Sequence, residues 1–188
     1  MHILLLDNYD SFTYNLAQIL RESKLCTFDI VKNDKIVISE VVKYDKILLS
    51  PGAGIPSEAG KMLKLIELFY QKKPILGICL GMQAIAEFFG GEIFNMNTVF
   101  HGIKEEIKIL SHDYLFENFD ITENVGLYHS WAVCENNLPK ELKITAISKN
   151  NIIMALKHED FDICGVQFHP ESYITKNGRK IIENWLKK

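Results

Sequence analysis

Residues 73–86 read KPILGICLGMQAIA, and the fold is decided in this stretch. The apolar run at Ile75–Ile78 predicts a short buried strand that passes without a linker into a helix. Cys79 stands at the corner between them, in the pattern Gly-x-Cys-x-Gly made with Gly77 and Gly81. Such a corner strains the backbone of its central residue and directs that side chain outward, while the glycines let strand and helix approach closely.

The corner makes Cys79 a candidate nucleophile. The first turn of the helix directs unpaired N–H groups at the sulfur, and the helix dipole favours a negative charge there. Both effects favour the thiolate, which is the nucleophilic form of cysteine. The alternative is an ordinary core cysteine, since free Cys is among the most buried residue types. The two flanking glycines favour the nucleophile.

The composition is typical of a soluble globular protein with a single domain over residues 1–188. Hydrophobic residues make up 47% of the chain and charged residues 24%, which is ordinary. The net charge of −3 gives no reason to expect nucleic acid or an acidic membrane as partner. No apolar run approaches the roughly 20 residues of a membrane span. The opening MHILLL stops at Asp7 without a basic lead or a cleavage site, so it predicts a strand and not a signal peptide.

The cysteines point to a reducing compartment. They show no Cys-x-x-Cys pair and no regular spacing, which argues against a zinc site and against a disulfide framework. We therefore expect a cytoplasmic protein with free thiols at Cys26, Cys79, Cys134 and Cys164.

Residues 1–91 alternate between strands and helices. This order implies an α/β fold with an open, mostly parallel sheet and helices on both faces. Asp10 and Ser11 are candidate N-caps of the first helix, and Ser57 of the second. Segment 37–42 fits either a short helix or a strand. The predicted strands are residues 3–6, 27–32, 46–50 and 75–78, and the predicted helices are residues 12–23, a segment after Ser57 that carries Met62, Leu65, Ile66 and Phe69, and the segment from the corner to 90–91.

The character of the chain changes after residue 92. Short β-type runs follow one another with few helical stretches, which predicts a smaller antiparallel extension of the sheet. The chain then returns to a core strand and ends in a helix with Ile181, Ile182, Trp185 and Leu186 on one face. The short runs are residues 93–96, 103–110, 144–148, 152–156 and 163–168.

A cysteine nucleophile needs a base and a group that orients the base. His169 is the best candidate base, because it follows an apolar strand within residues 165–172 (GVQFHPES). Parallel strands build sites at their carboxyl ends, where the Cys79 corner also lies. Glu171 can turn back on the imidazole, with Pro170 stiffening the link. The alternative is a solvated turn, but the pairing with Cys79 predicts a catalytic triad.

Two further segments can contribute to a site. Residues 50–54 (SPGAG) follow a strand, and their N–H groups, with that of Leu80, could bind an oxyanion. A phosphate loop is excluded because neither Gly-Lys-Ser/Thr nor Gly-x-Gly-x-x-Gly is present, and a plain tight turn is the alternative. Residues 128–131 (YHSW) form a polar and aromatic loop, whereas His101-Gly102 indicates only a turn.

Together these motifs resemble the class I (triad) glutamine amidotransferases over nearly the whole chain. Residues 77–83, 50–54 and 165–172 occur in the order of that family. Residues 7–15 (DNYDSFTYN) and 128–130 are similar, more narrowly, to the glutaminase subunit (component II) of anthranilate synthase and of 4-amino-4-deoxychorismate (para-aminobenzoate) synthase. The resemblance implies a flavodoxin-like core, and the lack of a fused synthetase segment leads us to expect a free-standing small subunit.

The resemblance also implies roles for single residues. Cys79 would be the nucleophile on the side-chain amide of glutamine, His169 the base that protonates departing ammonia, and Glu171 its orienting partner. Water would then hydrolyse the thioester. The implied oxyanion and glutamine-binding residues are Gly52, Ala53, Gly54, Leu80, Gln83, Ser130 and Trp131.

The chain departs from the family pattern at three positions. Ala53 stands where the family often has Pro, which is expected to loosen the oxyanion loop slightly. Met82 stands where it often has His, and Ile103 where it has Lys after His-Gly. None of the three supplies a triad group.

The resemblance implies a heteromeric enzyme. Ammonia would pass to a chorismate-binding large subunit (component I), which makes anthranilate for tryptophan or 4-amino-4-deoxychorismate for folate. No cofactor is expected in this subunit, and Mg²⁺ only in the partner. The alternatives are an amidotransferase subunit of another pathway, a non-catalytic regulatory subunit of the same fold, and a cysteine hydrolase acting on peptides. The sequence does not choose between the tryptophan and folate pathways.

Overall fold

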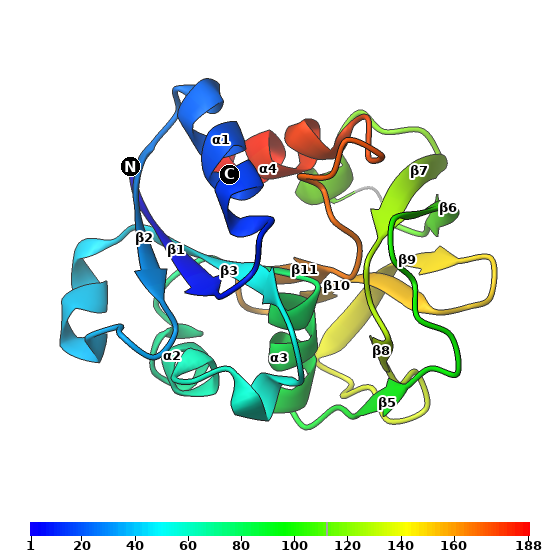
Figure 1. Ribbon diagram of the computed structural model, residues 1–188, viewed down its shortest axis with the longest axis horizontal. Helices are drawn as coiled ribbons and strands as arrows, with labels where there is room; N and C mark the ends of the chain where they lie inside the picture. The colour runs from blue at the N-terminus through cyan, green and yellow to red at the C-terminus, as the bar shows by residue number, and fades with distance from the viewer. Residues whose placement is uncertain (112) are drawn as a thin grey trace.

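A computed structural model describes residues 1–111 and 113–188. Within these residues a long sheet crosses the molecule with helices on both sides, as Figure 1 shows. Its strands are β1 (His2–Asn8), β2 (Thr27–Lys32), β3 (Lys46–Gly52), β4 (Ile75–Ile78), β6 (Ile103–Ile109), β7 (Thr122–Leu127), β9 (Leu142–Ser148), β10 (Ile153–His158) and β11 (Ile163–Val166). The helices are α1 (Thr13–Ser23), α2 (Met62–Phe69), α3 (Leu80–Phe88) and α4 (Gly178–Lys187), with short 3-10 helices η1 (Ile38–Lys43), η2 (Pro56–Glu58) and η3 (Tyr114–Phe116). No described helix is long and apolar enough to cross a membrane.

One half of the sheet is parallel, as predicted. Strands β2, β1, β3, β4 and β11 are neighbours in that order, and each pair is parallel. Side chains alternate between the faces of a strand. Ile3 and Leu5 of β1 join the core that contains residues of α1 and α4, whereas Leu4 and Leu6 join the core with α2 and α3. Both faces of β1 are covered, which explains its uninterrupted apolar run.

The other half is the predicted antiparallel extension. β11 pairs antiparallel with β10, and β9, β6 and β7 follow. All five predicted runs are strands, although 163–168 ends at Val166 and 152–156 continues to His158. The sequence did not predict β7, because TENVGL is half polar and contains glycine. It also missed β8 (Trp131–Val133), which is short and pairs with β5 (Ile93–Asn95) in a separate ribbon.

Two local predictions need correction, and the structure decides a third that was left open. The N-cap of α1 is Phe12 and not Asp10 or Ser11; the Asp10 side chain instead accepts the Phe12 N–H at 2.8 Å, in a turn before the helix. Ser57 lies inside η2 and does not cap α2, which begins at Met62 because Gly60 interrupts the helix with φ +55°. The undecided segment 37–42 is largely the 3-10 helix η1.

The predicted corner between β4 and α3 is tightly packed. Cys79 has φ +52° and ψ −105°, outside the regions that a side chain favours. A Cβ on Gly77 would lie 2.4 Å from the backbone carbon of Gly81, and a Cβ on Gly81 would lie 2.7 Å from the Cβ of Leu49. Helix α3 therefore rests directly on β4 and β3 because these positions carry no side chain.

Met82, which departs from the family pattern, belongs to this packing. It is fully buried, and its Cγ would lie 2.7 Å from a Cβ placed on Gly165 of β11. The thioether thus fills the space that the glycine leaves, in keeping with the use of Met in irregular core gaps. Met82 serves the core at this position.

Gly77→Ala tests the packing of the corner. The added methyl meets backbone that cannot move without displacing α3, so we expect a loss of about 3 kcal/mol in the free energy of unfolding. Gly90→Ala is the matched control, since its Cβ would meet nothing within 4 Å. Only the backbone strain at φ +94° opposes this substitution, so we expect a loss of about 1 kcal/mol in the free energy of unfolding. Urea unfolding of both variants measures the difference. Equal losses would contradict the close approach at Gly77.

Candidate active site

Cys79 lies at the carboxyl end of β4, next to the end of β11. Its N–H donates to the Val166 carbonyl at 2.8 Å, which ties the corner to the neighbouring strand. The N–H of Leu80 belongs to the first turn of α3 and has no intrahelical acceptor. Cys79 is only 5% exposed, yet it lines two cavities. The sulfur is thus held in place while a small molecule can still reach it.

His169 and Glu171 form a buried pair beside Cys79. The distance from His169 Nδ1 to Glu171 Oε1 is 2.7 Å, and the side chains are 2% and 0% exposed. The backbone around His169 is held as well, because its N–H donates to the Gly126 carbonyl and its carbonyl accepts from the Thr175 hydroxyl. The other ring nitrogen, Nε2, is buried and has no hydrogen-bond partner in the described structure. It is the atom free to exchange a proton with a substrate.

The charge of His169 follows from these neighbours. Burial by itself lowers the pKa of His169, but the negative charge of Glu171, the nearby Cys79 side chain and the hydrogen bond to Glu171 raise it well above its ordinary value. The folded protein therefore favours the imidazolium form of His169.

Two aromatic rings enclose His169. The centroids of Phe12 and Tyr128 lie 5.1 Å and 4.9 Å from the imidazole. Tyr128 also shares a hydrogen bond of 3.0 Å with Ser172, directly after Glu171. These rings keep water from the His169–Glu171 pair and so strengthen its electrostatic attraction. The sequence predicted only that Phe12 lies on a helix and that Tyr128 lies in a loop.

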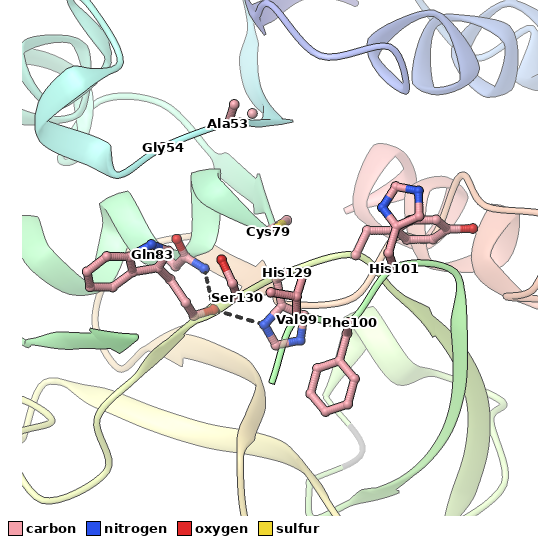
Figure 2. A pocket seen from close by; sticks show the side chains of 12 residues that line it. Ala53, Gly54, Cys79, Gln83, Val99, Phe100, His101, His129 and Ser130 are labelled. Carbon is pink, nitrogen blue, oxygen red and sulfur yellow. Dashed lines mark hydrogen bonds between the residues drawn. The ribbon is translucent and has the colours of Figure 1, made fainter. Parts of the chain in front are cut away.

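Most of the predicted binding residues meet at one cavity. A cavity of about 280 Å³ opens at Cys79 and is lined by Gly52, Ala53, Gly54, Gln83, Ser130 and Trp131, together with Val99, Phe100, His101, Tyr128 and His129 (Figure 2). Leu80 does not line this cavity, so any role there falls to its backbone N–H. A second cavity of about 210 Å³ also reaches Cys79 and is lined by His169, Phe12 and Asp10 among others.

The glycine loop touches the start of α3. A Cβ on Gly52 would lie 2.6 Å from Leu80 Cδ2 and 2.7 Å from Asn8 Cβ, so only glycine allows this approach. Asn8 braces the loop by donating to the Ser50 carbonyl at 2.8 Å. The structure thus brings Gly52 and Leu80 together, as the oxyanion prediction requires. Gly54 has φ +76°, which glycine adopts at little cost.

The carbonyl of Trp131 organises the opposite wall of the cavity. It accepts hydrogen bonds from Gln83 Nε2 and from His129 Nδ1, both at 2.9 Å, drawn as dashed lines in Figure 2. Burial lowers the pKa of His129 to about 4; the bond to Trp131 opposes this shift and the nearby His169 charge adds to it. His129 is therefore neutral near pH 7, with its proton on Nδ1.

Sequence reasoning missed several lining residues. Val99 and Phe100 reach the cavity from the segment between β5 and β6, and no pattern marks them. His101 was interpreted as a turn only. Gln167 was quoted within a motif but given no role, although its amide lies 3.5 Å from the Cys79 sulfur. A polar residue at the end of an apolar strand was the signal that could have identified it.

The sequence matches the glutamine amidotransferase class-I family over residues 4–188. It is 42% identical to anthranilate synthase component 2 of Lactococcus lactis, over 98% of this chain and 93% of that protein. It is also 42% identical to aminodeoxychorismate/anthranilate synthase component 2 of Bacillus subtilis, over 98% of this chain and 95% of that protein. The crystal structure of a proposed GMP synthase subunit from Thermoplasma acidophilum matches with a TM-score of 0.89 and 30% identity, covering 100% of this chain and 92% of that one.

The chain belongs to the class-I glutamine amidotransferase family. The match covers all the motifs on which the resemblance depends, and the structural neighbours share the α/β fold.

Glu171→Gln tests the electrostatics of the pair. The neutral amide removes the main attraction that opposes burial, so the pKa of His169 should fall below its ordinary range. Because the folded pKa of the native protein exceeds the unfolded one, the stabilisation by the pair is complete below about pH 6.5 and is lost as the pH rises through the folded pKa. NMR titration of His169 measures the shift, and His129 in the same spectra is the internal control. An unchanged His169 titration would contradict the role of Glu171.

Proposed function

We propose that this chain is the glutaminase subunit of a chorismate-using synthase. It hydrolyses the side-chain amide of L-glutamine through Cys79, His169 and Glu171 and delivers the ammonia to a large subunit. The observation that carries the proposal is the buried His169–Glu171 pair at 2.7 Å, beside a cysteine strained into φ +52° at the floor of a cavity.

The first half of the reaction forms a thioester. The Cys79 thiolate attacks the side-chain carbon of glutamine, and the amide oxygen takes up the electron pair opposite the N–H groups of Gly52 and Leu80. His169 Nε2 then donates its proton to the nitrogen as the carbon–nitrogen bond breaks. Ammonia leaves, and His169 is neutral.

The second half restores the enzyme. His169 Nε2 takes a proton from water, which attacks the thioester carbon. The carbon–sulfur bond breaks, glutamate leaves, and the Cys79 thiolate again faces the His169 imidazolium. Glu171 holds Nδ1 throughout, so that Nε2 stays directed at the reacting atoms. Gln83, Ser130 and Trp131 would bind the amino-acid end of glutamine on the facing wall.

The names of the relatives support a chorismate-binding partner. One relative is named anthranilate synthase component 2, and the other is named aminodeoxychorismate/anthranilate synthase component 2. We propose that this chain needs no cofactor of its own, that Mg²⁺ belongs to the large subunit, and that the complex works in the cytoplasm. The described cysteines are all free, which supports a reducing compartment.

The likeness to a proposed GMP synthase subunit favours, as a second candidate, ammonia delivery to an enzyme of nucleotide synthesis.

Cys79→Ala tests the chemistry. In a mixture with a component I subunit, ammonia release from glutamine should fall at least about a thousandfold, since no other thiol can replace the nucleophile. Cys134→Ala is the matched control, because this half-buried thiol does not line the cavity, and its activity should be unchanged. Unchanged ammonia release in Cys79→Ala would refute the mechanism and favour a regulatory subunit. Cleavage of peptides without any partner would instead favour a cysteine protease.

The partner should raise the turnover of this subunit. Ala53 and Gly54 are exposed at the mouth of the cavity, so a large subunit can complete the oxyanion loop and the ammonia route. We expect glutaminase activity to increase by roughly tenfold when the correct large subunit is added. Adding the component I subunits of tryptophan and folate synthesis, and a GMP synthase partner as control, identifies the pathway. Equal turnover with and without every partner would count against activation.

A further inference from the structure

We propose that Gln167 is a further catalytic residue, whose side-chain amide donates a hydrogen bond to the reacting sulfur of Cys79. This role rests on the proposed function and deepens it. Gln167 would hold Sγ in line with the cavity and stabilise the thiolate before the carbon–sulfur bond forms and when it breaks again.

The position of Gln167 leaves its side chain little freedom. It follows β11 directly, is fully buried, and its N–H donates to the Met154 carbonyl at 2.9 Å. Its side-chain Nε2 lies 3.5 Å from Cys79 Sγ, within the range of a hydrogen bond to the large sulfur atom. Its Oε1 accepts from Gln83 Nε2 at 3.1 Å. Both ends of a buried amide are thus used, as burial of polar groups requires.

The neighbours determine which end of the amide faces the sulfur. The Trp131 carbonyl can only accept, so Gln83 must present its Nε2 there. That same Nε2 also donates to Gln167, so the acceptor there must be the side-chain oxygen of Gln167. The NH₂ group of Gln167 is therefore directed at Cys79. The orientation follows from a main-chain carbonyl and does not rely on telling nitrogen from oxygen in a side-chain amide.

A neutral amide donor complements His169. The imidazolium must give up its proton during the reaction, whereas the amide of Gln167 keeps both of its protons throughout. A hydrogen bond to a charged group is about twice as strong as a neutral one, so Gln167 favours Cys79 most when the sulfur carries its negative charge. In the reaction proposed above, the sulfur is an anion when it attacks glutamine and again when glutamate leaves. Gln167 therefore assists the departure of the thiolate from the thioester.

Gln167 also connects the sulfur to the facing wall of the cavity. A chain of hydrogen bonds runs from Cys79 through Gln167 and Gln83 to the Trp131 carbonyl. Trp131 and Gln83 are proposed to bind the amino-acid end of glutamine. Binding of the amino-acid end of glutamine at this wall can thus change the hydrogen bond that Gln167 donates to the Cys79 sulfur.

Other titratable groups also face the sulfur and must be kept constant in a test. They lie on the loop after β11, on the segment before α1, on the segment before β6 and on the segment between β7 and β8. These groups are His169 with Glu171 behind it, Asp10, His101, Tyr128 and His129.

Gln167→Met removes the donor and retains the volume. Gln83 Nε2 keeps the Trp131 carbonyl as acceptor, so the facing wall remains satisfied. We expect the pH midpoint for alkylation of Cys79 by iodoacetamide to rise by about one pH unit, and kcat for glutamine hydrolysis to fall about tenfold. KM for glutamine should change less than about threefold, and the thioester should accumulate.

Thr145→Val is the matched control. Thr145 is a buried polar residue whose hydroxyl has no partner in the described structure, and it lines neither cavity at Cys79. Its alkylation midpoint and kcat should equal those of the native protein. An equal midpoint in Gln167→Met would overturn the proposal, because a residue that only packs is replaced well by methionine.

A second measurement does not depend on a folded Gln167 variant. In the native protein, alkylation of Cys79 removes the thiolate, and the side-chain amide resonances of Gln167 should shift more than those of Gln18, an exposed glutamine on α1. No shift at Gln167 would also overturn the proposal. Alkylation needs neither glutamine nor a partner, so these results stand apart from the proposed function, which is tested separately by ammonia release from the native protein and from Cys79→Ala with the large subunit.

Discussion

The structure depends on how closely helix α3 rests on strands β4 and β3. Gly77 and Gly81 remove the side chains that would keep the backbones apart, and their spaces are filled by backbone atoms and by the Cβ of Leu49. The chain must then turn within one residue, and this forces Cys79 to φ +52°. A non-glycine residue in a sparsely populated region costs about 1–3 kcal/mol, which the surrounding core must offset. At this corner Cys79 packs at the edge of the core and still lines both cavities.

The remaining site groups converge because parallel strands end at one edge. Cys79 follows β4, Gln167 and His169 follow β11, and Gly52 ends β3. These strands are adjacent in the sheet, so a few residues past each end are enough to bring the groups into contact. The antiparallel strands supply the facing wall, since His129 and Ser130 lie between β7 and β8 and Trp131 begins β8. The extension thus converts a sheet edge into a cavity.

Two histidines line the two cavities that meet at Cys79, and their environments give them different charges. His169 has a carboxylate at 2.7 Å and stays charged, whereas His129 has only a carbonyl acceptor and burial lowers its pKa to about 4. One histidine can move protons near neutral pH, and the other holds the wall in a single tautomer. The same residue type is therefore charged in one place, where we propose that it acts in catalysis, and neutral in the other.

Short-range patterns in the sequence determined the order of strands and helices in residues 1–91, the corner at Cys79 and the His169–Glu171 pair. Apolar periodicity, glycine spacing and a stiff two-residue link are local properties, so no knowledge of the fold is needed to see them. Only the tertiary structure decided the contacts of Gln167, which is separated by 88 residues from Cys79 and by 84 from Gln83. It also decided the places of Val99, Phe100 and strands β7 and β8, which carry weak local preferences and take their conformation from the surfaces against which they pack.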